Sequence, residues 1–165
     1  MLTKGEEAEL AKLIEKMEWP LPHDVFHALV KKIITVPVEL AVFDKGMGRI
    51  LLHYREDEEF KGWHMPGTVV RDNEDVKGAI QRLLTDELEL EDNSSVTWPE
   101  NHGWLEVKRK IGVRHLISLL FSCRMVKDYG GPGDFFEVNR LPNDTLKHHR
   151  VLVKEILARM GRGGL

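Results

Sequence analysis

The chain has 165 residues, with Lys+Arg 24 against Asp+Glu 27 and a formal net charge of −3. This length suits one domain that needs no disulfide, and the lone Cys123 cannot form one within the chain. The small net charge argues against nucleic acid or a membrane surface as a partner. The longest apolar stretch, Leu116–Cys123, falls short of the roughly 20 residues of a transmembrane helix. With an acidic N-terminus unlike a signal peptide, these features predict a soluble, cytoplasmic protein.

The N-terminal segment is predicted to form two helices that precede the main domain. Apolar residues recur at helical spacing over 6–17, and prolines end this helix. Asp24 is a suitable N-cap for a second helix that runs to Lys32. We therefore expect a helical extension over residues 1–32 and a main domain over residues 33–165.

The main domain alternates between strands and helices. Apolar and β-branched runs predict strands at residues 33–43, 49–54, 63–70, 96–108, 113–125 and 135–139. Pro37 marks the first as an edge or bulged strand, and a bend at 110–112 joins two long strands. Helices are predicted over 75–88 and 144–160, the second capped by Asn143 or Asp144. Strands flanked by helices predict a layered α/β or α+β domain.

The helix over 75–88 carries a carboxylate on its apolar face. That face is formed by Val76, Ala79, Ile80, Leu83, Leu84 and Leu88. Glu87 falls in the middle of it, where a charge is costly unless it is paired or bound to a metal. One interpretation is an ion pair, for example with Arg55, or an opening of the face to solvent. The other is a metal site.

The loop and helix around Glu87 resemble the Nudix box, G-x5-E-x7-R-E-U-x-E-E-x-G-U. The positions that match this pattern without a gap are Glu74, Arg82, Leu84, Asp86, Glu87 and Leu90. Three positions depart from it: Thr68 replaces the first glycine, Leu83 the first clustered glutamate and Glu89 the second glycine. The pattern is moderately specific, because it requires a strand, a loop and a helix in that order, which the sequence supplies.

The resemblance covers most of the chain. Residues 39–43 and 50–55 look like the first strands of a Nudix domain, and residues 62–67 resemble its approach to the box. On this basis the chain is identified as a member of the Nudix superfamily. The resemblance implies a curved mixed β-sheet sandwiched between α-helices, here with an extra N-terminal helical segment.

The resemblance also implies hydrolysis of a nucleoside diphosphate linked to another moiety, with Mg²⁺ or Mn²⁺ as cofactor. A divalent cation neutralises the diphosphate, and Mg²⁺ prefers oxygen ligands. Carboxylates at i, i+3 and i+4 share one helix face. Because the first of these is Leu83, Asp86 and Glu87 remain, and we expect few metal sites, with Glu74 as a further candidate ligand. In the family, the acid at Glu74 orients the box arginine, here Arg82.

The substitution at Leu83 is similar to the box of the GDP-mannose mannosyl hydrolases. That branch uses one metal ion, and water attacks the sugar carbon. Arg55 occupies the position of a phosphate-contacting arginine in that branch, and we expect Gly67 and Thr68 to complete the substrate-binding set. A second arginine of the branch is absent, since Val69 takes its place. The expected substrate is therefore a nucleoside diphosphate derivative such as a nucleotide sugar.

The general base is the least defined of the catalytic residues. Asp134 is the acid at the end of the loop over 129–134 and is our candidate; an ordinary loop residue is the alternative. His148 and His149 fall in the first turn of the closing helix, where we expect them to be exposed.

Two classes of function remain open. The retained box acids and Arg82 favour a Nudix hydrolase that acts on a small nucleotide. Leu83 and Val69 favour a Nudix-fold module that binds a nucleotide or a partner without turnover. Of the four tryptophans, which could stack on a nucleobase, we expect three to fill the core or the interface of a homodimer.

Overall fold

The computed structural model describes residues 2–57, 59–108 and 114–162, and the chain divides into two units, Met1–Ile33 and Ile34–Leu165. The first unit contains α1 (Lys4–Glu15) and α2 (His23–Val30). α1 begins before the predicted residue 6 because Thr3 and Glu6 form a capping box. The prediction of Asp24 as an N-cap is wrong, since Pro22 occupies that position and Asp24 lies in the first turn.

The second unit is built on a seven-stranded mixed sheet. Its strands are β1 (Pro37–Phe43), β2 (Arg49–Glu56), β3 (Lys61–His64), β4 (Gly67–Val69), β5 (Glu100–Val107), β6 (Leu116–Arg124) and β7 (Asp134–Glu137). The main path is β3-β2-β1-β6-β5, with β4 paired to β1 and β7 paired to β2. β1 and β6 run parallel, and the other pairs are antiparallel. The predicted bend at 110–112 lies outside the described residues.

The first strand of this sheet is central, so the prediction of an edge or bulged strand is wrong. β1 lies between β2 and β6, and all seven of its residues are buried. Pro37 is the first residue of the strand and is paired with Val69. A proline is tolerated at that position because its missing N–H interrupts no continuing ladder.

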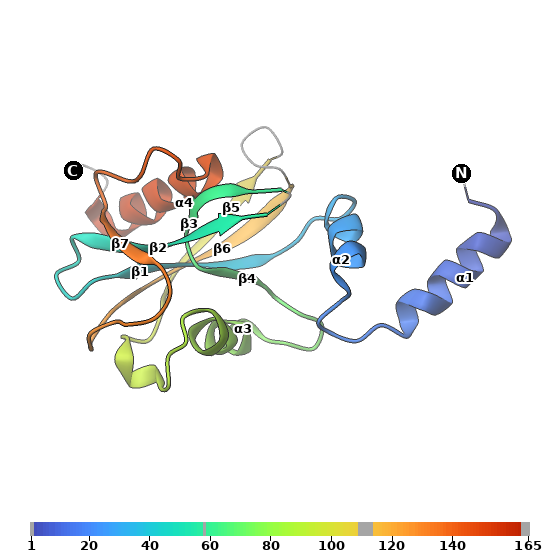
Figure 1. Ribbon diagram of the computed structural model, residues 1–165, viewed down its shortest axis with the longest axis horizontal. Helices are drawn as coiled ribbons and strands as arrows, with labels where there is room; N and C mark the ends of the chain where they lie inside the picture. Colours follow the sequence, from blue (N-terminus) through green and yellow to red (C-terminus); the bar gives the residue numbers. More distant parts are fainter. Residues whose placement is uncertain (1, 58, 109–113, 163–165) are drawn as a thin grey trace. The chain divides into compact units, whose positions relative to one another are not determined.

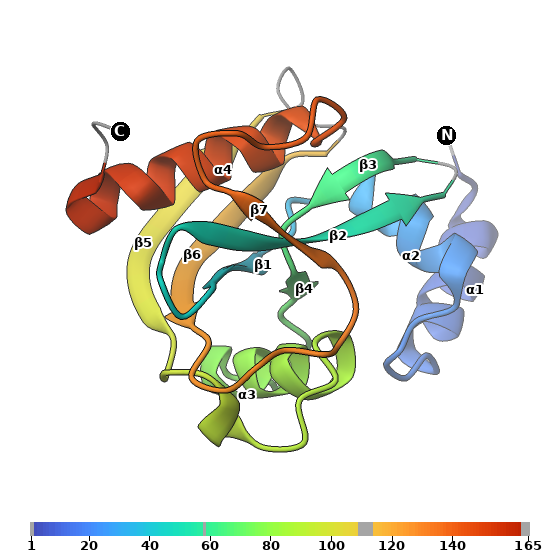
Figure 2. The same cartoon turned by 60° about the vertical axis from the view of Figure 1, so that its left-hand side comes forward.

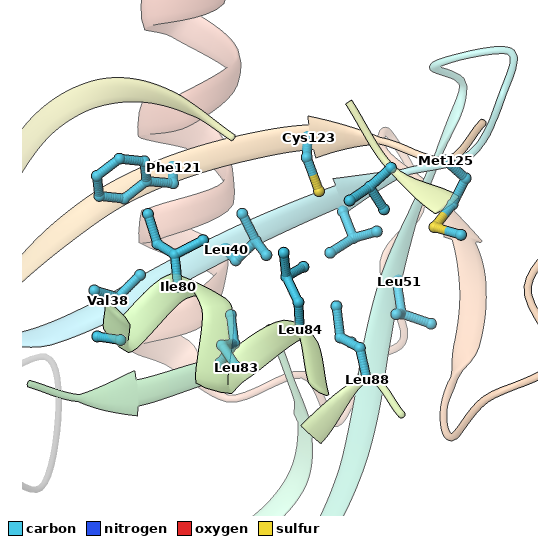
Figure 3. Close-up of a cluster of buried hydrophobic side chains, with 13 residues drawn as sticks. Val38, Leu40, Leu51, Ile80, Leu83, Leu84, Leu88, Phe121, Cys123 and Met125 are labelled. Atoms are coloured by element: carbon cyan, nitrogen blue, oxygen red, sulfur yellow. The ribbon is translucent and has the colours of Figure 1, made fainter. Parts of the chain in front are cut away.

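Helices cover both faces of the sheet (Figures 1 and 2). α4 (Lys147–Leu157) packs on one face, over a cluster that includes Phe43. α3 (Val76–Arg82) packs on the other face, over a cluster that includes Leu40 (Figure 3). Because successive residues of a strand point to opposite faces, β1 contributes to both clusters. The structure therefore has the predicted arrangement of a mixed sheet between helices.

Only one tryptophan joins the core of this unit. Trp63 packs on Phe136, with ring centroids 4.7 Å apart. Trp98 and Trp104 are 51% and 61% exposed, and Trp19, in the first unit, is also exposed. The tryptophans therefore do not mainly fill the core, and the other half of the prediction, that they lie in the interface of a homodimer, stays a prediction.

The helix predicted over 75–88 is interrupted after Arg82. It continues as one π-helical turn, η1 (Leu83–Glu87), in which the N–H of Leu88 donates to the carbonyl of Leu83 at 3.1 Å. A π turn adds one residue to the ring closed by each hydrogen bond, so it rotates the following side chains relative to an α-helix. The positions of Asp86 and Glu87 therefore differ from those predicted for a continuous α-helix.

A left-handed residue ends this turn. The N–H of Leu90 donates to the carbonyl of Leu84 at 3.0 Å, and the intervening Glu89 has a φ of 53°. This bond across a left-handed residue is a common helix ending that favours glycine. Glu89 occupies the box position that is glycine in the family pattern, so the backbone retains the conformation although the residue type has changed.

The closing helix begins later than predicted, and neither Asn143 nor Asp144 caps it. α4 starts at Lys147 without a side-chain cap. Residues 144–146 instead lie beside β3, where the N–H of Leu146 donates to the carbonyl of Trp63 at 2.9 Å. Gly62 permits this approach, because a Cβ at that position would collide with the carbonyl oxygen of Asp144. Backbone pairing with β3 therefore replaces helix capping.

Two short helical turns, η2 (Asn93–Ser95) and η3 (Ala158–Arg162), complete the elements. Among the residues that the structure describes, no helix is both long and apolar enough to span a lipid bilayer.

We predict that Glu89→Gly stabilises the fold. A non-glycine residue at φ 53° is strained, and glycine removes this strain. Glycine also gives the unfolded chain more conformational entropy, which lowers stability by a smaller amount. The free energy of unfolding should therefore rise by about 0.5–1 kcal/mol. Urea unfolding measures the change. The exposed Glu91, which lacks a positive φ, provides the control, and Glu91→Gly should destabilise. Equal losses of stability in both variants would contradict the prediction.

Candidate functional site

Arg82, at the end of α3, joins the helix to the loop and strand that precede it. Its guanidinium donates to both carboxylate oxygens of Glu74, each at 2.8 Å, and to the carbonyl of Val69 at 3.0 Å. It also donates to Oγ1 of Thr68 at 2.6 Å. Bidentate pairing of arginine with a carboxylate is among the stronger polar interactions in proteins. We refer to Arg82, Glu74, Thr68 and Val69 as the Arg82 clamp.

The electrostatics of Glu74 follow from this clamp. The hydrogen bonds from Arg82 lower the pKa of Glu74 to about 2, and the N–H of Arg71 adds a further bond at 2.9 Å. Both oxygens of Glu74 are therefore occupied by donors. This arrangement suits a residue that positions Arg82 and the loop.

Thr68 replaces the first glycine of the box with a side chain that the clamp uses. Its hydroxyl accepts a hydrogen bond from Arg82, and its backbone pairs with Val38 of β1. The departure from the family pattern therefore adds a polar contact between β4 and α3.

Glu87 lies at the end of η1, beside β4 and β2. The N–H of Gly67 is 3.4 and 3.3 Å from its two carboxylate oxygens, and Nδ1 of His53 is 3.4 Å from Oε1. The Glu87 side chain retains 26% of its exposure. Arg55 is not its partner, so the ion pair considered from sequence does not form; His53 and a backbone N–H occupy that place.

The sequence prediction missed a second carboxylate, Glu39, in the middle of β1. This residue is 5% exposed, and its Oε2 atom has no hydrogen-bond partner. Burial, with a smaller contribution from the charge of Glu87, raises the pKa of Glu39 well above its ordinary value. A Cβ at Gly67 would lie 2.8 Å from Oε2 of Glu39, so glycine is needed where β4 passes this side chain. The sequence signal that could have found Glu39 is its charge within the otherwise apolar run over 37–43.

The two histidines of α4 are buried, so the expectation that they are exposed is wrong. His148 and His149 are 8% and 7% exposed. His149 Nδ1 accepts the N–H of Met65 at 3.3 Å, which fixes the start of α4 against the chain after β3. Burial lowers the pKa of His148 to about 4 and the pKa of His149 well below its ordinary value. Both imidazoles are therefore neutral at pH 7.

A pocket of about 120 Å³ opens between β1, β3, β4 and the start of α4. Its lining includes the three residues predicted to bind substrate, Arg55, Gly67 and Thr68, together with Glu39, Phe60, Arg114, His64, His148 and His149. Glu87 is adjacent to it through Gly67, which lines the pocket and donates to Glu87. The structure thus places the predicted substrate-binding residues around one cavity next to the box.

Arg55 lines this pocket, and its side chain is 40% exposed. Its Nε atom pairs with Asp57, and its Cζ atom lies 4.8 Å from the centroid of the Phe60 ring. Such stacking of a guanidinium on an aromatic ring orients the cation without neutralising it.

The remaining predicted residues lie outside this arrangement. Asp86 is exposed and accepts the hydroxyl of Thr85 at 3.1 Å. Asp134 is exposed, and its backbone pairs with Leu52 of β2. The next residue of β2, His53, contacts Glu87, and successive strand residues point to opposite faces, so Asp134 lies on the other face of the sheet from this contact. Leu83 is 1% exposed and packs in the core near Val38 and Ile80 (Figure 3). A glutamate at Leu83 would therefore be buried in this geometry.

Comparison with known proteins identifies the family. A model of the NUDIX domain matches residues 35–156, and the chain belongs to this family. The chain is 35% identical over 69 residues to the low-salt glycan biosynthesis protein Agl8 of Haloferax volcanii. That match covers 41% of this chain and 43% of the relative, so it spans less than half the length of each protein.

Solved structures share the fold at low sequence identity. A mutT/nudix family protein from Listeria innocua superposes with a TM-score of 0.60 and 17% identity, over 77% of this chain and 94% of that chain. The NUDIX domain of Shewanella oneidensis NrtR, crystallised with ADP ribose, gives a TM-score of 0.57 and 13% identity, over 96% and 99%. These similarities confirm the predicted Nudix fold.

We predict that Glu74→Gln lowers the free energy of unfolding by about 2 kcal/mol at pH 7, because it removes charge-assisted hydrogen bonds to Arg82. The depressed pKa means that Glu74 stabilises the fold above its unfolded pKa near 4.5 and loses this effect as pH falls toward 2. The difference between wild type and variant should therefore shrink from pH 5 to pH 2 in urea titrations. A difference that does not change with pH would contradict the assignment.

Proposed function

We propose that this protein is a metal-dependent hydrolase that cleaves a nucleoside diphosphate linked to another moiety, with nucleotide sugars as the substrate class. The observation that supports this most is the Arg82 clamp. It holds β4 so that Gly67 lies between the carboxylates of Glu87 and Glu39, at a pocket that also contains Arg55. Acidic groups for a cation and a basic group for phosphate are thus adjacent.

The residues at Gly67 fit a divalent cation. Two carboxylates approach this strand, one raises the pKa of the other, and Oε2 of Glu39 has no hydrogen-bond partner. Positive charge at this place would relieve the repulsion. Among the residues that the structure describes, no group of three or more acidic, cysteine or histidine side chains is arranged to hold a metal ion. We therefore assign Glu87 as the principal ligand of Mg²⁺ or Mn²⁺, with Asp86 and backbone or phosphate oxygens as further candidates.

When bound, the cation would neutralise the diphosphate and stabilise it as a leaving group. The chain itself contributes three things. Arg82 and Glu74 fix the loop, Arg55 contacts the phosphates, and Gly67 leaves room for the diphosphate to approach the backbone. We retain Asp134 as the proposed general base, at the end of a loop in which Gly133 packs closely on His53.

A nucleotide-binding module without turnover is the second candidate. The observation that favours it is Leu83, whose side chain belongs to the core and supplies no carboxylate to the site. A screen distinguishes the two functions. Nucleoside diphosphate sugars, ADP-ribose, dinucleoside polyphosphates and nucleoside triphosphates are incubated with Mg²⁺ or Mn²⁺, and products are identified. Hydrolysis that EDTA abolishes supports the enzyme; binding without any product supports the module.

We predict that Glu87→Gln reduces hydrolysis by about 10²-fold or more, since a metal supplies several kcal/mol of charge stabilisation. The variant keeps the shape of the side chain, so its thermal unfolding should resemble that of wild type. Glu91→Gln, on an exposed position beyond the same turn, is the matched control and should retain activity. Equal activity in both variants would remove Glu87 from the site.

We further predict that water attacks the sugar carbon and not phosphorus. The buried Leu83 leaves little capacity for a second cation that would activate water against phosphorus. Hydrolysis in ¹⁸O-labelled water should therefore place the label in the released sugar. Asp134→Asn should lower turnover by about 10²–10⁴-fold if Asp134 is the base, with Asp128→Asn as a loop control. Label in the phosphate product would overturn carbon attack.

A further inference from the structure

His53, in the middle of β2, is a buried imidazole beside the box that the proposed reaction does not use. It is 9% exposed, and its Nδ1 atom lies 3.4 Å from Oε1 of Glu87. A carboxylate only accepts hydrogen bonds, so the N–H of this imidazole faces Glu87. His53 is not among the described residues that line the pocket next to the box. It can therefore serve the reaction only through Glu87.

The other ring nitrogen of His53 makes no polar contact. Its Nε2 atom is buried and has no hydrogen-bond partner in the described part of the chain. A buried nitrogen without a partner costs stability, and a leucine would fill a similar space without this cost. The contact with Glu87 is thus the feature of His53 that an apolar side chain could not supply.

Packing holds the imidazole in one orientation. The backbone at Gly133 passes so close to the ring that a Cβ at that position would collide with Cδ2 of His53. His64, the partner of His53 across β2 and β3, places its ring nearly perpendicular to it, with the centroids 6.1 Å apart. In such a close-packed setting, Nδ1 cannot turn away from Glu87 without displacing a neighbour.

The loop that contains Gly133 also packs against the end of η1. A Cβ at Gly131 would lie 2.7 Å from the carbonyl oxygen of Leu88, the residue that follows Glu87. One glycine of this loop therefore lies against the backbone beside Glu87, and the other lies against the imidazole of His53. The loop supports the carboxylate at two points.

Glu87 thus faces two donors that these contacts hold in place. The N–H of Gly67 is 3.3 and 3.4 Å from its two oxygens, and the imidazole of His53 is the second donor. A carboxylate has about four acceptor positions, so two donors orient it and leave positions for a cation. Carboxylates that bind metal ions are commonly fixed by hydrogen-bond partners of this kind.

We propose that His53 is a positioning residue for Glu87: its Nδ1–H holds the carboxylate in the orientation that binds the divalent cation. This inference rests on the proposed function, because Glu87 is taken to be the principal ligand. Loss of such a partner typically lowers metal affinity about 10- to 100-fold. The effect should therefore appear in binding of the metal alone, without substrate or turnover.

Titration with Mn²⁺, in which electron paramagnetic resonance measures the free ion, tests this role. His53→Leu fills a similar space and removes the donor, so the dissociation constant for Mn²⁺ should rise about tenfold or more. His53→Asn is smaller but keeps an N–H close to the place of Nδ1, so it should recover most of the affinity. A side chain that only fills space would give the reverse order, with leucine tolerated and asparagine harmful.

The matched control is His102, a partly buried histidine of β5 whose Nε2 atom lies 2.7 Å from Oγ of Ser122. His102→Leu should leave Mn²⁺ binding unchanged. Circular dichroism and thermal unfolding establish that each variant folds. If His53→Leu does not fold, His53→Gln replaces it, because its longer amide reaches the place of Nε2 and also lacks the donor to Glu87.

The inference is overturned if the variant without the donor binds Mn²⁺ as tightly as wild type, if asparagine fails as leucine does, or if His102→Leu weakens binding equally. Unchanged binding in His53→Leu, with tight binding in wild type, contradicts this inference and leaves the proposed function standing. A wild-type protein that binds no Mn²⁺ contradicts both.

Discussion

The site depends on the ion pair between Arg82 and Glu74. The guanidinium of Arg82 also donates to Thr68 and Val69, so a single side chain ties β4 and the following loop to the end of α3, in addition to the hydrogen bond from Gly67 to Glu87. β4 in turn pairs with β1 and carries Gly67. One partly buried charge pair therefore fixes the spacing between the helix that carries Glu87 and the strand that carries Glu39.

Residue types can change within this framework when the backbone requirement is met by other means. Thr68 fills a glycine position and gains a hydrogen bond from Arg82. Glu89 fills another and adopts the left-handed conformation itself, at a cost in strain that the helix-ending hydrogen bond offsets. Leu83 fills a carboxylate position and joins the core, where complete burial of a leucine contributes about 1.5–3 kcal/mol. Thr68 and Glu89 preserve the backbone geometry of the box. Leu83 instead removes a carboxylate from the helix and adds an apolar side chain to the core.

Sequence patterns predicted the fold because apolar periodicity and the spacing of the box are local. They located Glu74, Arg82, Gly67 and Glu87, whose relation is set by one loop and one helix. They missed Glu39 and misjudged His148 and His149, because the role of these residues depends on pairing between segments far apart in the chain. The late start of α4 illustrates the cause: a helix cap is a local preference, but backbone bonds to Trp63 outweigh it. The charged residue Glu39 inside the strand over 37–43 is visible in the sequence. A local pattern cannot show which distant residues it contacts.

Gly62 has a consequence for the order in which the protein matures. Its missing side chain lets residues 144–146, more than eighty positions later, lie against β3, and this contact brings the imidazoles of α4 to Glu39. During synthesis the box, β4 and Glu39 all emerge before α4. The half of the pocket that belongs to the box can therefore form first, and the cavity becomes enclosed when the last helix docks. The burial of Glu39 therefore depends on the docking of α4, whose His149 lies 3.7 Å from it, as well as on the strands beside β1.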